Sequence, residues 1–134
     1  VQVELVAEIV AWNRGPLGKL ADHPLDDPRT ELAVDDVAKV IRHAHNEFDA
    51  IMLDVDNGPS ALVDERNGWL YTDDGLQAIR RALKQGGEVA IWSADDEPEF
   101  PSRMRRNGYY SDRHRIRAHK GKGGGRHVIF TGRK

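Results

Sequence analysis

The chain has 134 residues, of which 39% are apolar and 31% are charged, and it contains no cysteine. This composition is typical of one globular domain, and it excludes a disordered or collagen-like chain, disulfide bonds and thiolate metal sites. No apolar run reaches the length of about 18 residues that a membrane-spanning helix needs, and 20 basic against 22 acidic residues give a net charge of −2, which does not favour a nucleic-acid-binding protein.

The chain begins inside a predicted element. Residues 1–5 are mainly apolar and predict a core strand, and because the chain opens within it at Val1, we expect a fragment or a processed chain. A short helix over 8–13 and a connector over 15–29, rich in Gly, Pro and Asp, follow. They lead to a second short strand over 30–34.

The middle of the chain is predicted to alternate helices with strands. The helix after the second strand carries apolar residues at the spacing of one buried face; they are Val37, Val40, Ile41 and Ala44. Residues 48–53 are apolar without alternation, which predicts a fully buried strand. A helix capped by Thr72 or Asp73 should continue to Leu83, with the Gly86-Gly87 pair as its left-handed stop.

The last third predicts a buried strand over 88–93, a short helix over 100–107, and two antiparallel strands over 109–118 and 127–131. A loop of lysine and glycine joins these last two strands. The alternation of strands and helices indicates an α/β domain with a mostly parallel sheet, helices on both faces and a C-terminal antiparallel hairpin.

Acidic residues gather where the predicted strands end. Glu4 lies near the end of the first strand, Asp35 and Asp36 end the second, and Asp54 and Asp56 follow the third. Ligands of open α/β sheets bind beyond the carboxyl ends of the strands, where an acid can accept the hydroxyls of a ribose. An acid beside the next strand can accept the exocyclic amine of adenine, and a cluster of acids favours a cationic ligand.

Each of these acids also has a purely structural interpretation. Asp at a strand end is often a turn former or a helix cap, and for Asp35 we favour the cap. For Glu4 we favour a functional role, because burying an unpaired acid in an apolar strand is costly. For Asp54 both interpretations stay open.

Several short motifs occur in one order along the chain and together carry a resemblance. They are Glu4-Leu5 before Ile9-Val10, Asp27-Pro28-Arg29 before a strand, an acid at Asp36, Phe48-Asp49-Ala50-Ile51 leading to Asp54, and Leu83-Lys84-Gln85-Gly86-Gly87 before a strand. This set resembles the spermidine synthases, or polyamine aminopropyltransferases. It is most similar to the bacterial spermidine-synthase-like proteins with an Asp-Val-Asp-Asn-Gly-Pro loop.

The resemblance implies a Rossmann-like three-layer sandwich, the fold of class I S-adenosylmethionine-dependent methyltransferases. Residues 1–134 would then form a single, partial catalytic domain. The first strand and the glycine-rich loop of that fold should precede Val1 and are missing. Without them, the strands over 1–5 and 49–54 must pair directly, or another chain must fill the gap.

The resemblance also implies roles for individual residues. Glu4 is similar to the acid that holds the ribose hydroxyls, Asp36 with Asp35 to the acids at the adenine, and Asp54 to the catalytic Asp. The residues implied for substrate binding are Asp56, Asn57 and Tyr71. The implied reaction is attack of an amine nitrogen on the propyl carbon of decarboxylated S-adenosylmethionine, from which methylthioadenosine leaves. Asn57 stands where the family usually has a second Asp.

Two further functions stay open. One is methyl transfer from S-adenosylmethionine on the same fold. The other is a truncated, non-catalytic module that binds a nucleoside or a partner, which the absent glycine loop suggests.

The expected partners are a small amine and further copies of the chain, because strand edges left open by a missing strand tend to pair. We expect no membrane partner. We also expect no metal site, since His43 and His45 lie two apart on a helix and do not share a face. Nucleic acid is not expected; Arg113, Arg115 and Arg117 alternate along one strand as a solvated stripe, with contact to RNA as the alternative. The absence of cysteine fits the cytoplasm.

Overall fold

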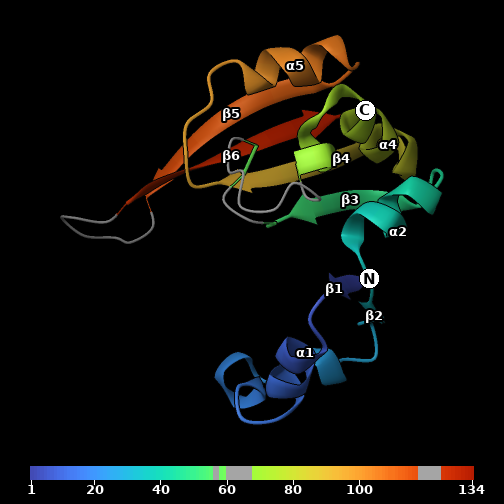
Figure 1. Cartoon of the computed structure of the whole chain (residues 1–134), viewed down its shortest axis with the longest axis vertical. Helices are drawn as coiled ribbons and strands as arrows, with labels where there is room; N and C mark the ends of the chain where they lie inside the picture. Colours follow the sequence, from blue (N-terminus) through green and yellow to red (C-terminus); the bar gives the residue numbers. More distant parts are fainter. Residues whose placement is uncertain (56–57, 60–67, 118–124) are drawn as a thin grey trace. The chain divides into compact units, whose positions relative to one another are not determined.

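The computed structural model describes residues 1–55, 58–59, 68–117 and 125–134. The chain divides into two compact units, unit 1 over Val1–Val40 and unit 2 over Ile41–Lys134 (Figure 1). Each unit is described by itself.

Unit 1 is a small βαβ arrangement. Strand β1 (Gln2–Glu4) pairs in parallel with β2 (Leu32–Val34). Helix α1 (Ala7–Arg14) lies between them in the chain, and the predicted connector contains two short 3-10 helices, η1 (Gly18–Ala21) and η2 (Pro24–Asp26). Both predicted strands are confirmed but are only three residues long.

The expectation that the first strand is a core strand is wrong for the unit as described. Val1 and Leu5 at its two ends are 66% and 57% exposed. In the described part of the chain β1 has one paired neighbour, β2. A strand with one neighbour leaves much of its surface open.

Helix α2 (Val37–His43) contains the division between the two units. The predicted helix is confirmed, but its buried positions differ in part from the predicted stripe. Ala38, Ile41 and Ala44 are buried, whereas Val37 and Val40 are half-buried.

Unit 2 is built on a four-stranded sheet with the order β3-β4-β6-β5. Strand β3 (Phe48–Leu53) pairs in parallel with β4 (Leu83–Ser93), and helix α4 (Asp73–Ala82) lies between them in the chain. Strand β6 (Arg126–Arg133) is antiparallel to β4 and to β5 (Tyr110–Arg117). The predicted C-terminal hairpin is therefore confirmed, and residues 118–124 between its strands lie outside the described residues.

The core of unit 2 lies between this sheet and the helices α4 and α5 (Phe100–Arg106). Its members are fully buried apolar side chains from both layers; they include Leu76, Ile79, Val89, Ile91, Met104 and Phe130. The Phe100 ring from α5 stands edge-on to Phe130 at 5.1 Å between centroids. The buried Tyr109 hydroxyl donates to the Leu76 carbonyl oxygen over 2.7 Å and so ties β5's start to α4.

The prediction that residues 48–53 form a fully buried strand is wrong. Leu53 is buried, but Ala50 is exposed and Met52 is 86% exposed. Successive side chains of a strand point to opposite faces, and the described helices of unit 2 cover one face of the sheet. An uninterrupted apolar run therefore suits a strand whose two faces are both covered. In the described part of unit 2, one face of β3 is covered and the other is open.

The predicted helix over 72–83 is confirmed in its start and corrected at its end. The Thr72 hydroxyl accepts from the Gly75 N–H over 3.2 Å, as the cap predicted. The helix ends at Ala82, and the Gly86-Gly87 pair is not its stop but part of β4. Gly86 has φ +78° and lies where the pairing with β3 shifts register, so this glycine serves a strand irregularity.

Candidate active site

The predicted acids of unit 1 meet at one edge of its sheet. Because β1 and β2 are parallel and Glu4 is paired with Val34, Glu4 and the Asp35-Asp36 pair leave the two strands side by side. The Asp35 N–H donates to the Glu4 carbonyl oxygen over 3.2 Å. The arrangement predicted from the strand ends is therefore present for these three residues.

Glu4 is half-buried, and its carboxylate is partly used. Oε1 accepts from the Val6 N–H over 2.9 Å, which fixes the side chain against the turn that follows β1. Its Oε2 accepts no hydrogen bond from the residues that the structure describes, and it is open to a donor such as a ribose hydroxyl.

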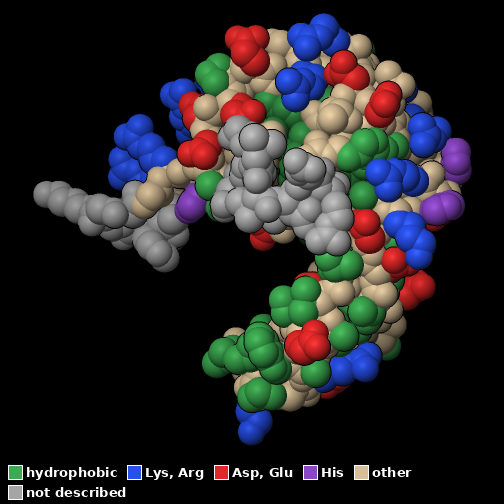
Figure 2. Space-filling view, in the orientation of Figure 1, with side chains coloured by type: hydrophobic (Ala, Val, Ile, Leu, Met, Phe, Trp, Pro, Cys, Tyr) green, Lys and Arg blue, Asp and Glu red, His purple; other side chains and the backbone are tan. Residues whose placement is uncertain are grey.

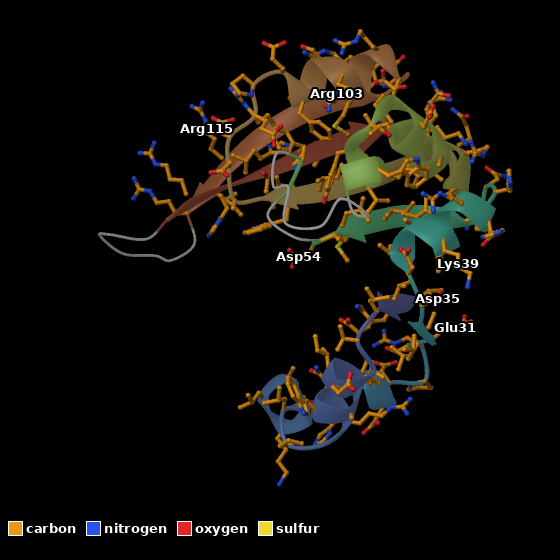
Figure 3. The ribbon with its side chains drawn as sticks, in the orientation of Figure 1. Glu31, Asp35, Lys39, Asp54, Arg103 and Arg115 are labelled. Carbon is orange, nitrogen blue, oxygen red and sulfur yellow. The ribbon has the colours of Figure 1, made fainter. Side chains whose placement is uncertain are left out.

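The helix cap predicted for Asp35 belongs instead to Asp36. Asp36 Oδ1 accepts from the Ala38 N–H over 2.8 Å, the contact that an N-cap makes. Asp35 accepts from the Asp36 N–H over 2.8 Å and pairs with Lys39 Nζ at 3.0 Å, one helical turn away (Figure 3). Sequence alone could not choose between two adjacent Asp residues that both precede a helix.

A pocket of about 240 Å³ opens beside Glu4 within unit 1. Gln2 and Glu4 alternate onto this face of β1, and side chains of α1, β2 and the connector, all apolar except Asn13, complete the wall. The lining residues are Gln2, Glu4, Ile9, Val10, Asn13, Pro24, Leu25 and Leu32. Pockets that enclose whole ligands usually measure about 300–1,000 Å³, so this one suits a part of a nucleoside-sized ligand.

Asp54 lies in unit 2, directly after β3 (Figure 3). It is exposed, and among the described residues its carboxylate accepts no hydrogen bond. Leu53, just before it, is paired with Ile91 of β4, so Asp54 emerges at the carboxyl edge of the two parallel strands. The predicted substrate residues Asp56 and Asn57 lie outside the described residues.

Two contacts fix the chain on either side of these positions. The buried Tyr71 hydroxyl donates to the Val55 carbonyl oxygen over 2.8 Å. Tyr71 belongs to the short 3-10 helix η3 (Trp69–Tyr71), and its own carbonyl oxygen accepts from Arg103 over 3.2 Å. The residue predicted to bind substrate thus lies against the backbone that follows Asp54.

The second contact is made by Gly58. This residue is buried with φ +101°, and a Cβ added to it would overlap the Ser93 hydroxyl and lie 2.6 Å from the Ser93 Cβ. Ser93 is fully buried at the end of β4, and its hydroxyl donates to the Asp95 carbonyl oxygen over 2.8 Å. This contact was not predicted from the sequence.

Parallel strands joined by crossover helices are the pattern of open α/β domains, whose ligands bind beyond the carboxyl ends of the strands. Within that class, the chain belongs to the spermine/spermidine synthase domain family, whose model matches residues 1–104. The resemblance found in the motifs is thereby confirmed.

Individual relatives agree with this assignment. The chain is 39% identical over 75 residues to the polyamine aminopropyltransferase of Thermotoga petrophila, a match that covers 56% of this chain and 23% of that protein. It is similar in fold to a spermidine synthase solved in complex with the transition-state analogue AdoDATO, with a TM-score of 0.78, 24% identity, and coverage of 98% of this chain and 45% of that one.

The wider fold class is confirmed as well. A Burkholderia thailandensis 1,6-didemethyltoxoflavin-N1-methyltransferase solved with S-adenosylhomocysteine matches with a TM-score of 0.61 and 17% identity, over 98% of this chain and 59% of that one. The chain thus spans about a quarter of the curated relative and under half of the solved synthase.

Two negative findings concern the described residues alone. Residues 1–55, 58–59, 68–117 and 125–134 contain no helix with the length and apolar character needed to cross a bilayer. In the same ranges no three His, Asp or Glu side chains converge on a position where a metal ion would bind.

Proposed function

We propose that the chain is the catalytic portion of an aminopropyltransferase that acts on a small amine. The observation that carries the proposal is Asp54, an open carboxylate at the carboxyl end of β3 inside the range that matches the family. Residues 1–134 would then be a single, partial catalytic domain of a longer enzyme.

Unit 1 would hold the nucleoside end of decarboxylated S-adenosylmethionine. Glu4 Oε2 can accept the hydroxyls of the ribose. Asp36 uses Oδ1 for the helix cap, and its Oδ2, which accepts no hydrogen bond from a described residue, can accept the exocyclic amine of adenine. Asp35 pairs with Lys39, and its negative charge adds to the acidic character of the same sheet edge. The analogue and the product named for the two solved neighbours are S-adenosyl compounds, which supports this class of co-substrate.

Asp54 would handle the proton of the acceptor. An alkyl ammonium has no lone pair, so its nitrogen must lose a proton before it can form a bond to carbon. A carboxylate beside the ammonium first binds it by charge and then accepts that proton, which frees the nitrogen lone pair for attack. One bond forms between nitrogen and the propyl carbon, and the bond from that carbon to sulfur breaks, so that a sulfonium becomes a neutral thioether. Asp56, Asn57 and Tyr71 remain our proposed substrate residues.

The test is release of methylthioadenosine from decarboxylated S-adenosylmethionine with a panel of linear diamines. Asp54→Asn should reduce the rate by about 100-fold or more, the usual contribution of a positioned general base. Asp74→Asn, at an exposed position in the first turn of α4, is the matched control and should keep the activity. Equal rates for the two variants would remove Asp54 from the mechanism.

Binding of the co-substrate is tested separately by calorimetric titration with decarboxylated S-adenosylmethionine and with S-adenosylmethionine. Glu4→Gln should weaken binding, whereas Glu8→Gln, on the exposed surface of α1, should not. Binding of either compound without any release of product would support the non-catalytic nucleoside-binding module.

Methyl transfer is the second candidate, because the described fold is shared with methyltransferases. A preference for S-adenosylmethionine in the titration, together with methylated product in mass spectrometry, would favour it. The proposed setting is the cytoplasm, with assembly into a homo-oligomer, which size-exclusion chromatography with light scattering would test.

A further inference from the structure

The positive charge of the chain is concentrated in its last 22 residues. Residues 113–134 contain eight of the 20 Lys and Arg residues and none of the 22 acidic ones, so they carry +8 and the rest carries −10. The near-neutral total therefore hides a strong separation of charge, which is a sign of a polyanion partner. This segment also lies beyond the residues that match the synthase family.

Four of these residues form an arginine stripe on one face of the β5–β6 hairpin. Arg113, Arg115 and Arg117 alternate along β5, so their side chains share a face. Arg126 of β6 is paired directly with Arg117 and joins them. Alternate residues of a strand lie about 6.6–6.8 Å apart along the backbone, so Arg113, Arg115 and Arg117 follow one another in a row on β5, and Arg126 lies beside the end of that row.

The first half of the stripe is held in place by a single acid. Asp96, in the loop after β4, accepts from Arg113 Nη1 over 3.0 Å and from Arg115 Nε over 2.8 Å. Arg115 is labelled in Figure 3, and Figure 2 shows Lys and Arg side chains gathered at the left, where β5 ends. One carboxylate against two guanidinium groups fixes their positions and leaves a net positive charge.

Among the residues that the structure describes, the second half of the stripe has no such partner. Arg117 and Arg126 face each other across the strand pair, and both are exposed. No carboxylate of the described residues pairs with either guanidinium group. Like charges directly opposite in a sheet are destabilising, and an anion bound between these two side chains would remove that cost.

We propose that the arginine stripe binds the phosphate backbone of a single-stranded nucleic acid. Arginines spaced along an extended strand suit phosphates spaced along an extended chain. Arg117 and Arg126, which no carboxylate of the described residues engages, can each donate two parallel hydrogen bonds to one phosphate. A membrane surface is the less suitable partner, because the sequence over 118–126 contains no Phe, Tyr, Trp or large aliphatic side chain that would enter a bilayer.

The test is fluorescence anisotropy of a labelled oligouridylate with the chain over a series of salt concentrations. We expect micromolar binding that weakens steeply with salt. Neutralising two arginines in Arg117→Gln/Arg126→Gln should remove two phosphate contacts. The slope of log K against log salt then becomes less negative by about 1.4, and affinity at about 0.1 M salt falls about 25-fold.

The matched control is Arg14→Gln/Lys19→Gln, which removes the same charge from exposed positions of unit 1. It should bind the oligonucleotide as the unchanged chain does, and circular dichroism should show that both variants remain folded. Equal weakening by both pairs would assign binding to bulk charge and overturn the proposal. So would binding to phosphatidylserine vesicles without binding to the oligonucleotide, or no salt-dependent binding at all.

Discussion

Substituting Gly58 by Ala should destabilise unit 2 through two effects that the structure separates. Gly58 has φ +101°, and an L-residue with a Cβ pays about 1–2 kcal/mol for a left-handed backbone. The new methyl group would also overlap the buried Ser93 side chain, and overpacking of this kind costs about 1–3 kcal/mol. We therefore expect the free energy of unfolding to fall by about 2–5 kcal/mol, measured by urea denaturation.

Gly86→Ala is the matched control for the first effect. Gly86 also has a positive φ, +78°, in unit 2, but no described atom lies within 4 Å of the position that its new methyl group would take, so only the backbone cost of about 1–2 kcal/mol applies. Ser93→Gly combined with Gly58→Ala should recover part of the overlap cost. If Gly58→Ala were no more destabilising than Gly86→Ala, the proposed close packing of Gly58 on Ser93 would be refuted.

Two further predictions concern buried tyrosines. Tyr71→Phe removes the donor to the Val55 carbonyl oxygen and should lower the free energy of unfolding by about 0.5–1.5 kcal/mol in a thermal melt; an unchanged melt would contradict that bond's contribution. Burial raises the pKa of Tyr109 above the value of about 10 that it has in the unfolded chain. The neutral phenol is therefore favoured on folding, and its contribution is complete below pH about 10 and falls as the pH rises toward the folded pKa. Urea midpoints between about pH 9 and 11 should fall less steeply for Tyr109→Phe, and equal slopes would contradict the assignment.

The elements were predictable where local chemistry decides them. The Thr72 cap, the apolar run that becomes β3, and the acid directly after it each depend on neighbours a few residues away in sequence. The same holds for Glu4 and the Asp35-Asp36 pair, because parallel strands bring their ends to one edge whatever lies elsewhere.

Other features depend on contacts distant in sequence, and the pattern could not predict them. The apolar run over 48–53 does not state which of its faces is covered, so the exposure of Met52 was missed. Gly86 follows a helix as a stop signal would, yet its role comes from the register of β4 against β3. The hydrogen bond from Tyr71 to Val55 joins residues 16 positions apart, a separation at which no local pattern operates.

The exposure of Met52 has a practical consequence. The chain has two methionines, and Met104 is fully buried in the core whereas Met52 is 86% exposed on the open face of β3. Peroxide converts an accessible thioether to its sulfoxide much faster than a buried one. The ratio of oxidation at the two residues therefore reports how accessible this face of unit 2 is. A protein that covers the face will protect Met52, and Met104 serves as the reference in the same molecule.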